Sequence, residues 1–268
     1  MNVQLLIIDP QNDFCHKDGA LFVGGANDDM ERLAAFITAK KDKLDDIHTT
    51  LDSHHLVDIA HPIFWMDSSG SSPDPFTIIT ADDVKNGTWA ATNPPMRKRA
   101  TDYVNSLQAN GRYPLCIWPP HCLIGSWGYS VYGPIYDAVM KWEQDFAMVD
   151  YVTKGSNFWT EHYSAVQADV PDPEDPGTQL NQGLIKTLQD ADMVLLAGEA
   201  RSHCLANTVR DIANNFGEDN IKKMYLLQDC TSDVGDLPGQ TMFKDMGEGF
   251  VSEMTVRGMN LTDSKSIL

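Results

Sequence analysis

The stretch MVLLAGEARSHCLANTVRDIA, residues 193–213, decides the fold because it joins a buried strand to an amphipathic helix through a short turn. The apolar run at its start, which ends in Ala-Gly, is typical of a strand in a parallel sheet. Beyond the turn, four apolar residues recur at the spacing of one helix face: Leu205, Val209, Ile212 and Phe216. Cys204 therefore lies at a strand-to-helix corner.

The position of Cys204 predicts a reactive thiol. Unpaired N–H groups and the macrodipole at a helix N-terminus favour an anion, so we expect this thiol to ionise more easily than free cysteine, whose pKa is about 8.5. The alternative is that Cys204 serves as a small buried hydrophobic residue, which is the usual role of a free cysteine.

Length and composition bound the class of protein. With 268 residues, of which 42% are hydrophobic, the chain can bury a sizeable core, and we expect one domain over residues 1–268. The start of the chain enters an apparent strand without a charged leader, and the sequence contains no apolar run of eighteen residues. We therefore expect a soluble protein that is not exported.

Cysteine usage and charge narrow the compartment and the partners. The five cysteines have irregular spacings and form no CxxC pair, which indicates a reducing cytoplasm rather than a disulfide framework. The formal charge of −18 argues against nucleic acid or an anionic membrane as a partner, because both attract basic surfaces. Association into a homo-oligomer is left open.

Strand-like and helical segments alternate along the chain, which predicts an α/β fold with a parallel sheet of about six strands and helices on both faces. The strand-like segments are residues 3–9, 46–52, 113–118, 146–154, 193–198 and 221–229. The helical segments are residues 30–41, 131–144, 179–190 and the helix after Cys204. Residues 66–100 and 169–178 interrupt this rhythm and are expected to form loops, and residues 262–268 a loosely held tail.

Polar residues follow the predicted strands at their carboxyl ends, where ligands bind in open α/β sheets. Five such ends carry Asp9, Asp52 with His54, Trp118 with His121, Lys154, and Cys204. Each residue alone could be a helix cap, a satisfied histidine or a surface lysine. Together they predict a functional site.

Five segments carry a resemblance to a known family. They are LLIIDPQNDF (5–14), TTLDSHH (49–55), WPPHCLIGS (118–126), VTKGSNFWTEHYSA (152–165) and AGEARSHC (197–204). In this order they resemble the nicotinamidase branch of the isochorismatase-like cysteine hydrolases, over nearly the whole chain except the insertion at 66–100 and the tail. The resemblance implies a three-layer isochorismatase-like fold and a catalytic triad of Asp9, Lys154 and Cys204.

The implied reaction is hydrolysis of an amide through a thioester. Cys204 would attack the carbonyl carbon, and Asp9 would move the proton to the departing ammonia and later activate water. Lys154 would stabilise both groups by its charge. The resemblance also implies an oxyanion hole made by the backbone N–H groups of Ala200 and Cys204, after a cis peptide between Glu199 and Ala200.

A divalent metal ion is implied beside the triad. Its ligands would be Asp52, His54 and His121, and its role would be to bind the ring nitrogen of the substrate. Zinc is the expected ion, and manganese or iron also suits one carboxylate with two imidazoles. His55 and His61 are rival ligands.

The positions that match the family's pocket are Phe14, Trp118 and Tyr163, with His203 beside the nucleophile, although each aromatic ring could equally be a core residue. The chain departs from the family where DSHH (52–55) replaces DWHP, where His203 replaces Tyr or Asn, and where Glu199 occupies an often apolar position. These departures concern the substrate rather than the chemistry.

The sequence therefore predicts a metal-assisted cysteine amidase that converts nicotinamide or a close analogue to the carboxylic acid and ammonia. The expected partner is a small-molecule amide. One alternative is a cysteine hydrolase of another small amide, such as a carbamoyl or ureido compound. The other is a non-catalytic metal- or ligand-binding protein of the same fold.

Overall fold

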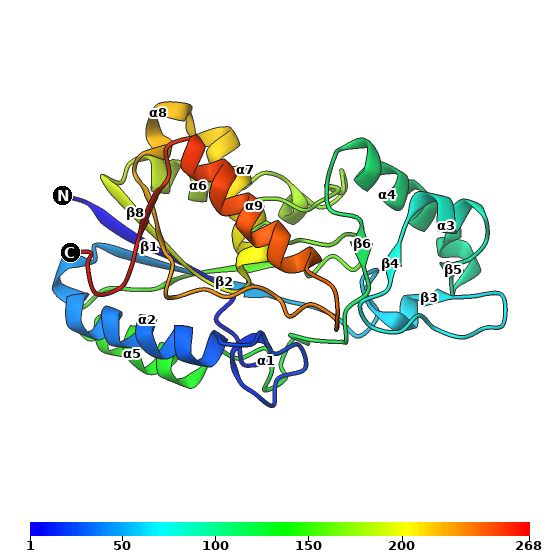
Figure 1. Cartoon of the computed structure of the whole chain (residues 1–268), viewed down its shortest axis with the longest axis horizontal. Coiled ribbons are helices and arrows are strands. Elements are labelled where there is room, and N and C mark those ends of the chain that lie inside the picture. The colour runs from blue at the N-terminus through cyan, green and yellow to red at the C-terminus, as the bar shows by residue number, and fades with distance from the viewer.

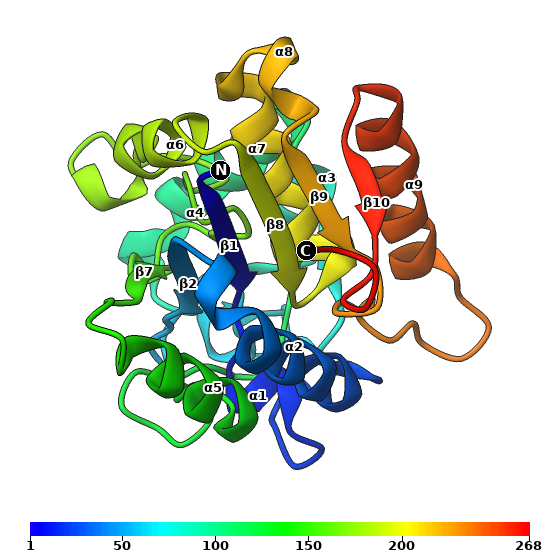
Figure 2. The ribbon, with the colours of Figure 1, turned by 90° about the vertical axis from the view of Figure 1, so that its left-hand side faces the viewer.

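The computed structural model describes all residues, 1–268, and is built on a six-stranded parallel sheet. The strand order is β10-β9-β8-β1-β2-β7 (Figure 2). The strands are β1 (Val3–Ile8), β2 (Asp46–Asp52), β7 (Asp150–Lys154), β8 (Met193–Gly198), β9 (Met224–Leu227) and β10 (Asn260–Thr262). The predicted α/β class and a parallel sheet of six strands are confirmed.

Helices cover both faces of the sheet, as the three-layer prediction requires (Figure 2). On one face lie α1 (Asn12–Cys15), α2 (Ala26–Lys40) and α5 (Gly133–Glu143). On the other lie α6 (Gln182–Gln189), α7 (Ala206–Phe216) and α8 (Glu218–Ile221), with α9 (Met242–Val256) beside β10. The helices predicted at 30–41, 131–144 and 179–190 correspond to α2, α5 and α6. None of the helices combines the length and the apolar character that a membrane span needs.

A small lobe stands at one end of the molecule, beyond the sheet (Figure 1). It contains β3 (Trp65–Met66), β4 (Ile78–Ile79), α3 (Ala81–Lys85), β5 (Ala90–Ala91), α4 (Arg97–Ala109) and β6 (Leu115–Cys116). β3 pairs with β5 and β4 pairs with β6, both antiparallel. The segment 66–100, expected to form loops, therefore has short strands and helices of its own.

The strand predicted at 113–118 is not part of the large sheet. Only Leu115 and Cys116 are in strand conformation, and they pair with β4 in the small lobe. A short apolar run has the same sequence pattern in a strand of a large sheet and in a strand of a two-stranded sheet, so the sequence could not distinguish the two. The sixth place in the large sheet is taken by β10, which comes from the C-terminal region.

The C-terminal tail is held against the sheet, and the prediction of a loosely held tail is wrong. Ser264 donates to both carboxylate oxygens of Asp229 through its backbone N–H and its hydroxyl, at 2.8 and 2.6 Å. The side chain of Lys40 donates to the terminal Leu268 carbonyl group at 2.8 Å. Polar groups of the tail make these hydrogen bonds, and a pattern of apolar residues cannot predict them.

The ends of β1 and β8 approach each other closely. Gly198 has a φ of +111°, and a Cβ atom there would lie 2.1 Å from the carbonyl oxygen of Ile8. The next residue, Glu199, donates its backbone N–H to the same oxygen at 2.8 Å. Glycine at this position brings the turn after β8 against the end of β1, where Asp9 follows.

Candidate active site

Three of the predicted residues meet at the carboxyl ends of the central strands. Asp9 follows β1, Lys154 ends β7, and Cys204 lies in the turn that leads into α7. The Nζ atom of Lys154 lies 2.9 Å from Asp9 Oδ2 and 3.6 Å from Cys204 Sγ. All three side chains are buried. The lysine thus bridges a carboxylate and a thiol at the bottom of the site.

Lys154 is held in place by more than the carboxylate of Asp9. Its Nζ atom also lies 3.0 Å from Asp52 Oδ1 and donates to the carbonyl oxygen of His162 at 2.9 Å. Burial by itself lowers the pKa of Lys154, but the charges of Asp52 and Asp9 outweigh it and raise that pKa well above its usual range. The ammonium group therefore stays charged.

Asp9 adopts an unusual backbone conformation with a φ of +45°. Its backbone N–H donates to Thr50 Oγ1 at 2.9 Å, and the Thr50 hydroxyl donates back to Asp9 Oδ1. Burial raises the pKa of Asp9, while the charge of Lys154 acts in the opposite direction. A fixed carboxyl group whose pKa is raised is suited to accept and return a proton.

Cys204 lies in a π-helical turn, Arg201–Leu205, that continues directly into α7. Burial raises the pKa of its thiol well above the usual range, Lys154 lowers it, and a hydrogen bond with Asp9 raises it further. The expectation of an easily ionised thiol is therefore not met, because burial outweighs the helix terminus. Asp9 is the carboxylate in contact with the thiol, so it can receive the proton directly.

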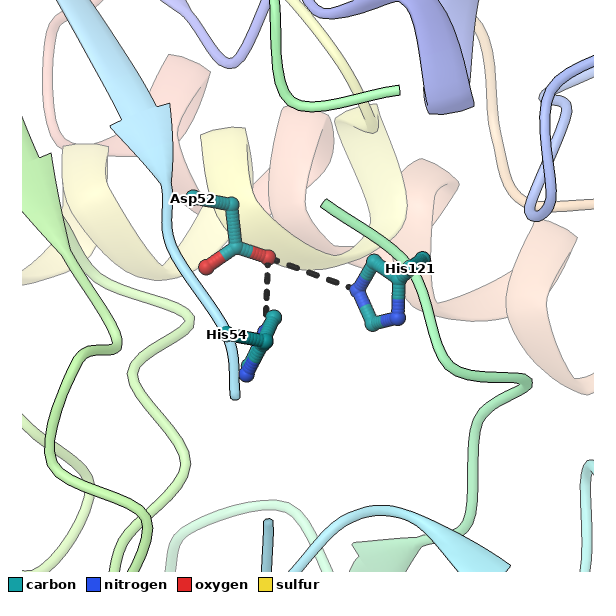
Figure 3. A group of neighbouring side chains, drawn as sticks. All are labelled: Asp52, His54 and His121. Atoms are coloured by element: carbon teal, nitrogen blue, oxygen red, sulfur yellow. Dashed lines mark hydrogen bonds and ion pairs between the residues drawn. The ribbon is translucent and has the colours of Figure 1, made fainter. Parts of the chain in front are cut away.

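The three predicted metal ligands form a second cluster, drawn in Figure 3. Asp52 Oδ2 lies 3.1 Å from His54 Nε2 and 3.4 Å from His121 Nε2. One ligand atom from each of the three residues lies within 4.8 Å of the others. The structure thus brings together the carboxylate at the end of β2 and two imidazoles from separate loops.

The far nitrogen of each imidazole is held by a partner outside the cluster. Nδ1 of His54 lies 3.0 Å from Asp58 Oδ2, and Nδ1 of His121 lies 2.9 Å from the carbonyl oxygen of Pro119. Such bonds fix the ring orientation and leave the Nε2 atoms of both rings beside Asp52. This is the arrangement that metal-ligating histidines require.

The two rival histidines differ in position. His55 is exposed, whereas His61 is buried with its ring centroid 5.2 Å from that of His54 and 5.7 Å from that of His121. Its Nε2 atom has no hydrogen-bond partner, and burial together with His121 and His54 lowers its pKa to about 4. His61 is therefore a neutral neighbour of the cluster with a free nitrogen.

A cavity beside Cys204 is lined by all four predicted pocket residues, Phe14, Trp118, Tyr163 and His203. Trp118 Nε1 donates to the hydroxyl oxygen of Tyr163 at 2.9 Å, which fixes the two rings against each other. Burial lowers the pKa of His203 to about 3, so the imidazole is neutral. Asp52 and His121 reach the same cavity, so the nucleophile and the candidate metal cluster face one space.

Sequence reasoning missed other residues of the cavity wall: Leu21, Val23, Val234 and Glu161. Glu161 is buried, and its Oε1 atom accepts the backbone N–H of His162 at 2.9 Å, but its Oε2 atom has no partner. Burial raises the pKa of Glu161 to about 7, and His54 acts in the opposite direction. No pattern in the sequence distinguishes this glutamate from a solvated one.

The turn between β8 and Cys204 contains the cis peptide between Glu199 and Ala200 that the resemblance implies. The carbonyl oxygen of Ala200 accepts the N–H groups of His203 and Leu205 at 3.0 and 3.2 Å. Ala200 also lines the cavity next to Cys204. The predicted oxyanion residues therefore lie at the cavity wall.

The fold and the site define an α/β protein with an Asp–Lys–Cys cluster beside an Asp–His–His cluster. Solved structures of nicotinamidases and pyrazinamidases share this fold. The yeast nicotinamidase Pnc1p is 18% identical, with a TM-score of 0.65 over 97% of this chain and 99% of that one. A nicotinamidase/pyrazinamidase of Acinetobacter baumanii is 19% identical, with a TM-score of 0.63 over 100% and 98%.

A pyrazinamidase of Pyrococcus horikoshii, solved in complex with zinc, is 18% identical, with a TM-score of 0.56 over 98% of this chain and 99% of that one. No family model matches the chain, and no curated protein matches its sequence. At these identities the likeness establishes the fold. What the chain does must be argued from its own site.

Proposed function

We propose that the chain is a metal-assisted cysteine amidase that hydrolyses nicotinamide or a close analogue to the carboxylic acid and ammonia. The observation that carries this proposal is that one cavity is lined by both Cys204 and the candidate metal ligands Asp52 and His121. The fold neighbours support it, since they are nicotinamidases, and one was solved with the inhibitor nicotinaldehyde.

In the proposed reaction, Asp9 accepts the thiol proton as the sulfur of Cys204 bonds to the carboxamide carbon. Asp9 then gives this proton to the nitrogen as the C–N bond breaks and ammonia leaves, which yields a thioester. A water molecule next loses a proton to Asp9 and attacks the thioester, and the carbon–sulfur bond breaks. The sulfur recovers its proton from Asp9.

Two groups stabilise charge during these steps. Lys154 remains an ammonium group that contacts both Asp9 and Cys204, so it favours the transfer of the proton within that pair. The backbone N–H groups of Ala200 and Cys204 are proposed to receive the negative oxygen of each tetrahedral intermediate.

The Asp52, His54 and His121 cluster fits a divalent cation, because both imidazoles have their Nδ1 atoms occupied and their Nε2 atoms beside one carboxylate oxygen. These residues would hold zinc, or manganese or iron, which suit the same donors. A bound cation would supply a Lewis-acid contact for a ring nitrogen of the substrate. The ring would be held by Phe14, Trp118, Tyr163 and His203.

A second candidate is hydrolysis of a more hydrophilic amide, such as a carbamoyl or ureido compound. It is favoured by Glu161, because the unpartnered Oε2 atom of this residue lies at the cavity wall and could accept an additional N–H group. A purely ligand-binding role is less well supported, because it gives no use to the buried Asp–Lys–Cys cluster.

The test is ammonia release by the purified protein, with its metal content measured, from nicotinamide, pyrazinamide, benzamide and a linear ureido compound. Benzamide lacks the ring nitrogen, so its kcat/KM should be about ten- to a hundredfold lower than that of nicotinamide, as expected for a lost polar contact of about 1 to 3 kcal/mol. Faster turnover of the ureido compound would favour the second candidate. No release from any amide would contradict both.

A further inference from the structure

The turn that carries Ala200 is anchored by a buried pair of carboxyl groups. Glu199 is fully buried. Asp29, which lies on α2, is 3% exposed. Both carboxyl groups accept a hydrogen bond from Ser232, and Glu199 Oε1 has no donor partner. Two buried carboxylates that meet at one residue repel each other, which favours a state in which one of the pair is neutral.

Ser232 joins both members of this pair to the turn. Its backbone N–H donates to Glu199 Oε2 at 3.1 Å, and its hydroxyl donates to Asp29 Oδ2 at 2.5 Å. Its carbonyl oxygen accepts the backbone N–H of Arg201 at 2.8 Å. Ser232 therefore holds the chain on both sides of Ala200. It is bonded to the side chain of Glu199 before Ala200 and to the backbone of Arg201 after it.

The charges around the pair identify Glu199 as the protonated member. Asp29 has a cation beside it, since Arg32 pairs with it on α2. Glu199 has no ion-pair partner, because Arg201, the cation that feels its charge, pairs with Asp233 instead. Burial comes first among the causes that raise the pKa of Glu199 well above the usual range, followed by Asp29, with Asp233 adding to them. The thiol of Cys15, on α1, also lies near Glu199, but a thiol cannot supply the positive charge that would stabilise a carboxylate.

Resting on the proposed amidase function, we propose that Glu199 is a positioning residue whose neutral carboxyl group, held between Asp29 and the Ser232 N–H, fixes the turn that presents Ala200 to the oxyanion. It touches neither substrate nor nucleophile. An apolar residue at this position could fill the space, but it would leave the Ser232 N–H without its acceptor. Glutamine would keep an acceptor oxygen there and carries no charge.

The kinetic test compares Glu199→Ala with Glu199→Gln. Loss of a single oxyanion donor costs about 10²- to 10³-fold in kcat, so a loosened turn should lower the kcat of Glu199→Ala about ten- to a hundredfold and change KM less than about twofold. Glu199→Gln should stay within about threefold of the wild type. Asp211→Asn, which alters a buried carboxylate on α7 that pairs with Arg112, is the control and should keep wild-type kcat.

A second measurement does not depend on activity. A carboxyl group that is neutral when folded and ionised when unfolded makes the protein less stable as the pH rises above the unfolded pKa of about 4.3. The Tm of the wild type should therefore fall between pH 5.5 and pH 8 by several degrees more than that of Glu199→Gln, because the amide cannot ionise. This comparison tests the neutral carboxyl group even if Glu199→Ala does not fold.

The outcomes separate this inference from the proposed function. Wild-type protein without amidase activity would contradict the function, and the Tm comparison would still test the neutral carboxyl group. An active wild type with unchanged kcat in Glu199→Ala would overturn the positioning role alone. Parallel Tm curves for wild type and Glu199→Gln would overturn the assignment of the proton to Glu199.

Discussion

The thiol of Cys204 is the one cysteine sulfur that contacts a charged lysine, since Lys154 Nζ lies 3.6 Å away. If it is the nucleophile, Cys204→Ala should abolish ammonia release, with a loss in kcat of at least about 10⁴-fold, as for other enzymes that lose a covalent group. The change removes one buried sulfur atom at the cavity wall, so the circular dichroism spectrum and the metal content should stay those of the wild type.

Cys116 provides the matched control for this prediction. It is also a buried free thiol, but burial raises its pKa well above the usual range and no lysine contacts it. Cys116→Ala should retain most of the turnover. A mass spectrum of partially alkylated protein would give the order of reactivity, and inactivation that follows labelling of Cys122 instead of Cys204 would show that the nucleophile has been assigned wrongly.

The metal cluster yields a second prediction at the residue scale. His121→Ala removes one of three proposed ligands and should lower the metal content measured by elemental analysis, because neither Asp52 nor His54 can replace an imidazole from that direction. The activity should fall mainly through a higher KM, since the ion is proposed to orient the substrate. Removal of the ion by a strong chelator should have the same effect on the wild type.

His55→Ala is the control for the metal prediction, because His55 is exposed and next to a proposed ligand in the sequence. It should bind a full equivalent of metal. Full occupancy in His121→Ala would instead point to His61, whose unpartnered Nε2 atom lies beside the cluster.

The sequence predicts which residues form the site better than it predicts how deeply they are buried. Residues at strand ends are fixed by the alternation of strands and helices, which is why Asp9, Lys154 and Cys204 could be placed together. Burial is a tertiary property, and it reversed the expected pKa shift of the thiol. Glu161 was missed for the same reason, because only packing shows that its carboxyl group is buried at the cavity.

At the scale of elements, Gly198 controls how closely β8 approaches β1. A Cβ atom at this residue would overlap the backbone of Ile8 at a φ of +111°, so Gly198→Ala should lower the free energy of unfolding by about 3 kcal/mol or more. A chemical denaturation series would measure this loss. Activity should fall as well, because the turn with Ala200 starts at the next residue.

Gly249→Ala is the matched control on α9. This glycine lies in the interior of the helix, a Cβ atom there would meet nothing within 4 Å, and its residue is exposed. Alanine should therefore raise the stability by about 0.5 to 1 kcal/mol, since glycine is a poor helix former. A stable, active Gly198→Ala protein would mean that the two strand ends can separate without consequence.

The elements that the sequence failed to predict are those with weak local patterns. β10 has only three residues, none of them buried, so nothing in its own composition marks it as a strand of the sheet. The helix α9 contains two glycines and starts after a loop, which weakens its helical pattern. By contrast, β8 is a continuous apolar run and β1 is apolar except for Gln4, and both were predicted correctly as strands.

At the scale of the whole molecule, the small lobe supports the pocket from behind. Phe76 packs edge-to-face against Trp118, with ring centroids 5.7 Å apart, and its backbone N–H donates to the carbonyl oxygen of Ile117. Trp118 in turn faces the cavity and bonds to Tyr163. If the cavity binds the substrate as proposed, we expect the insertion at 66–100 to affect substrate binding through Trp118.

Phe76→Ala should raise KM about two- to tenfold, because an edge-to-face aromatic pair contributes about 0.5 to 1.5 kcal/mol and its loss frees Trp118 to turn. The kcat should change little, since the lobe does not contact Asp9, Lys154 or Cys204. Steady-state kinetics with the best amide of the panel would measure both constants, and the rate at which iodoacetamide inactivates the enzyme would report on the thiol separately.

Phe146→Ala is the control, because Phe146 has a similar backbone φ, +63° against +69° for Phe76, while its side chain is fully exposed. The two variants make the same chemical change at the same type of backbone position, so any difference between them comes from contact with Trp118. Only Phe76→Ala should raise KM. If KM stays at the wild-type value in both variants, Trp118 keeps its position without the lobe; if kcat falls with KM unchanged, the lobe instead acts on the catalytic cluster.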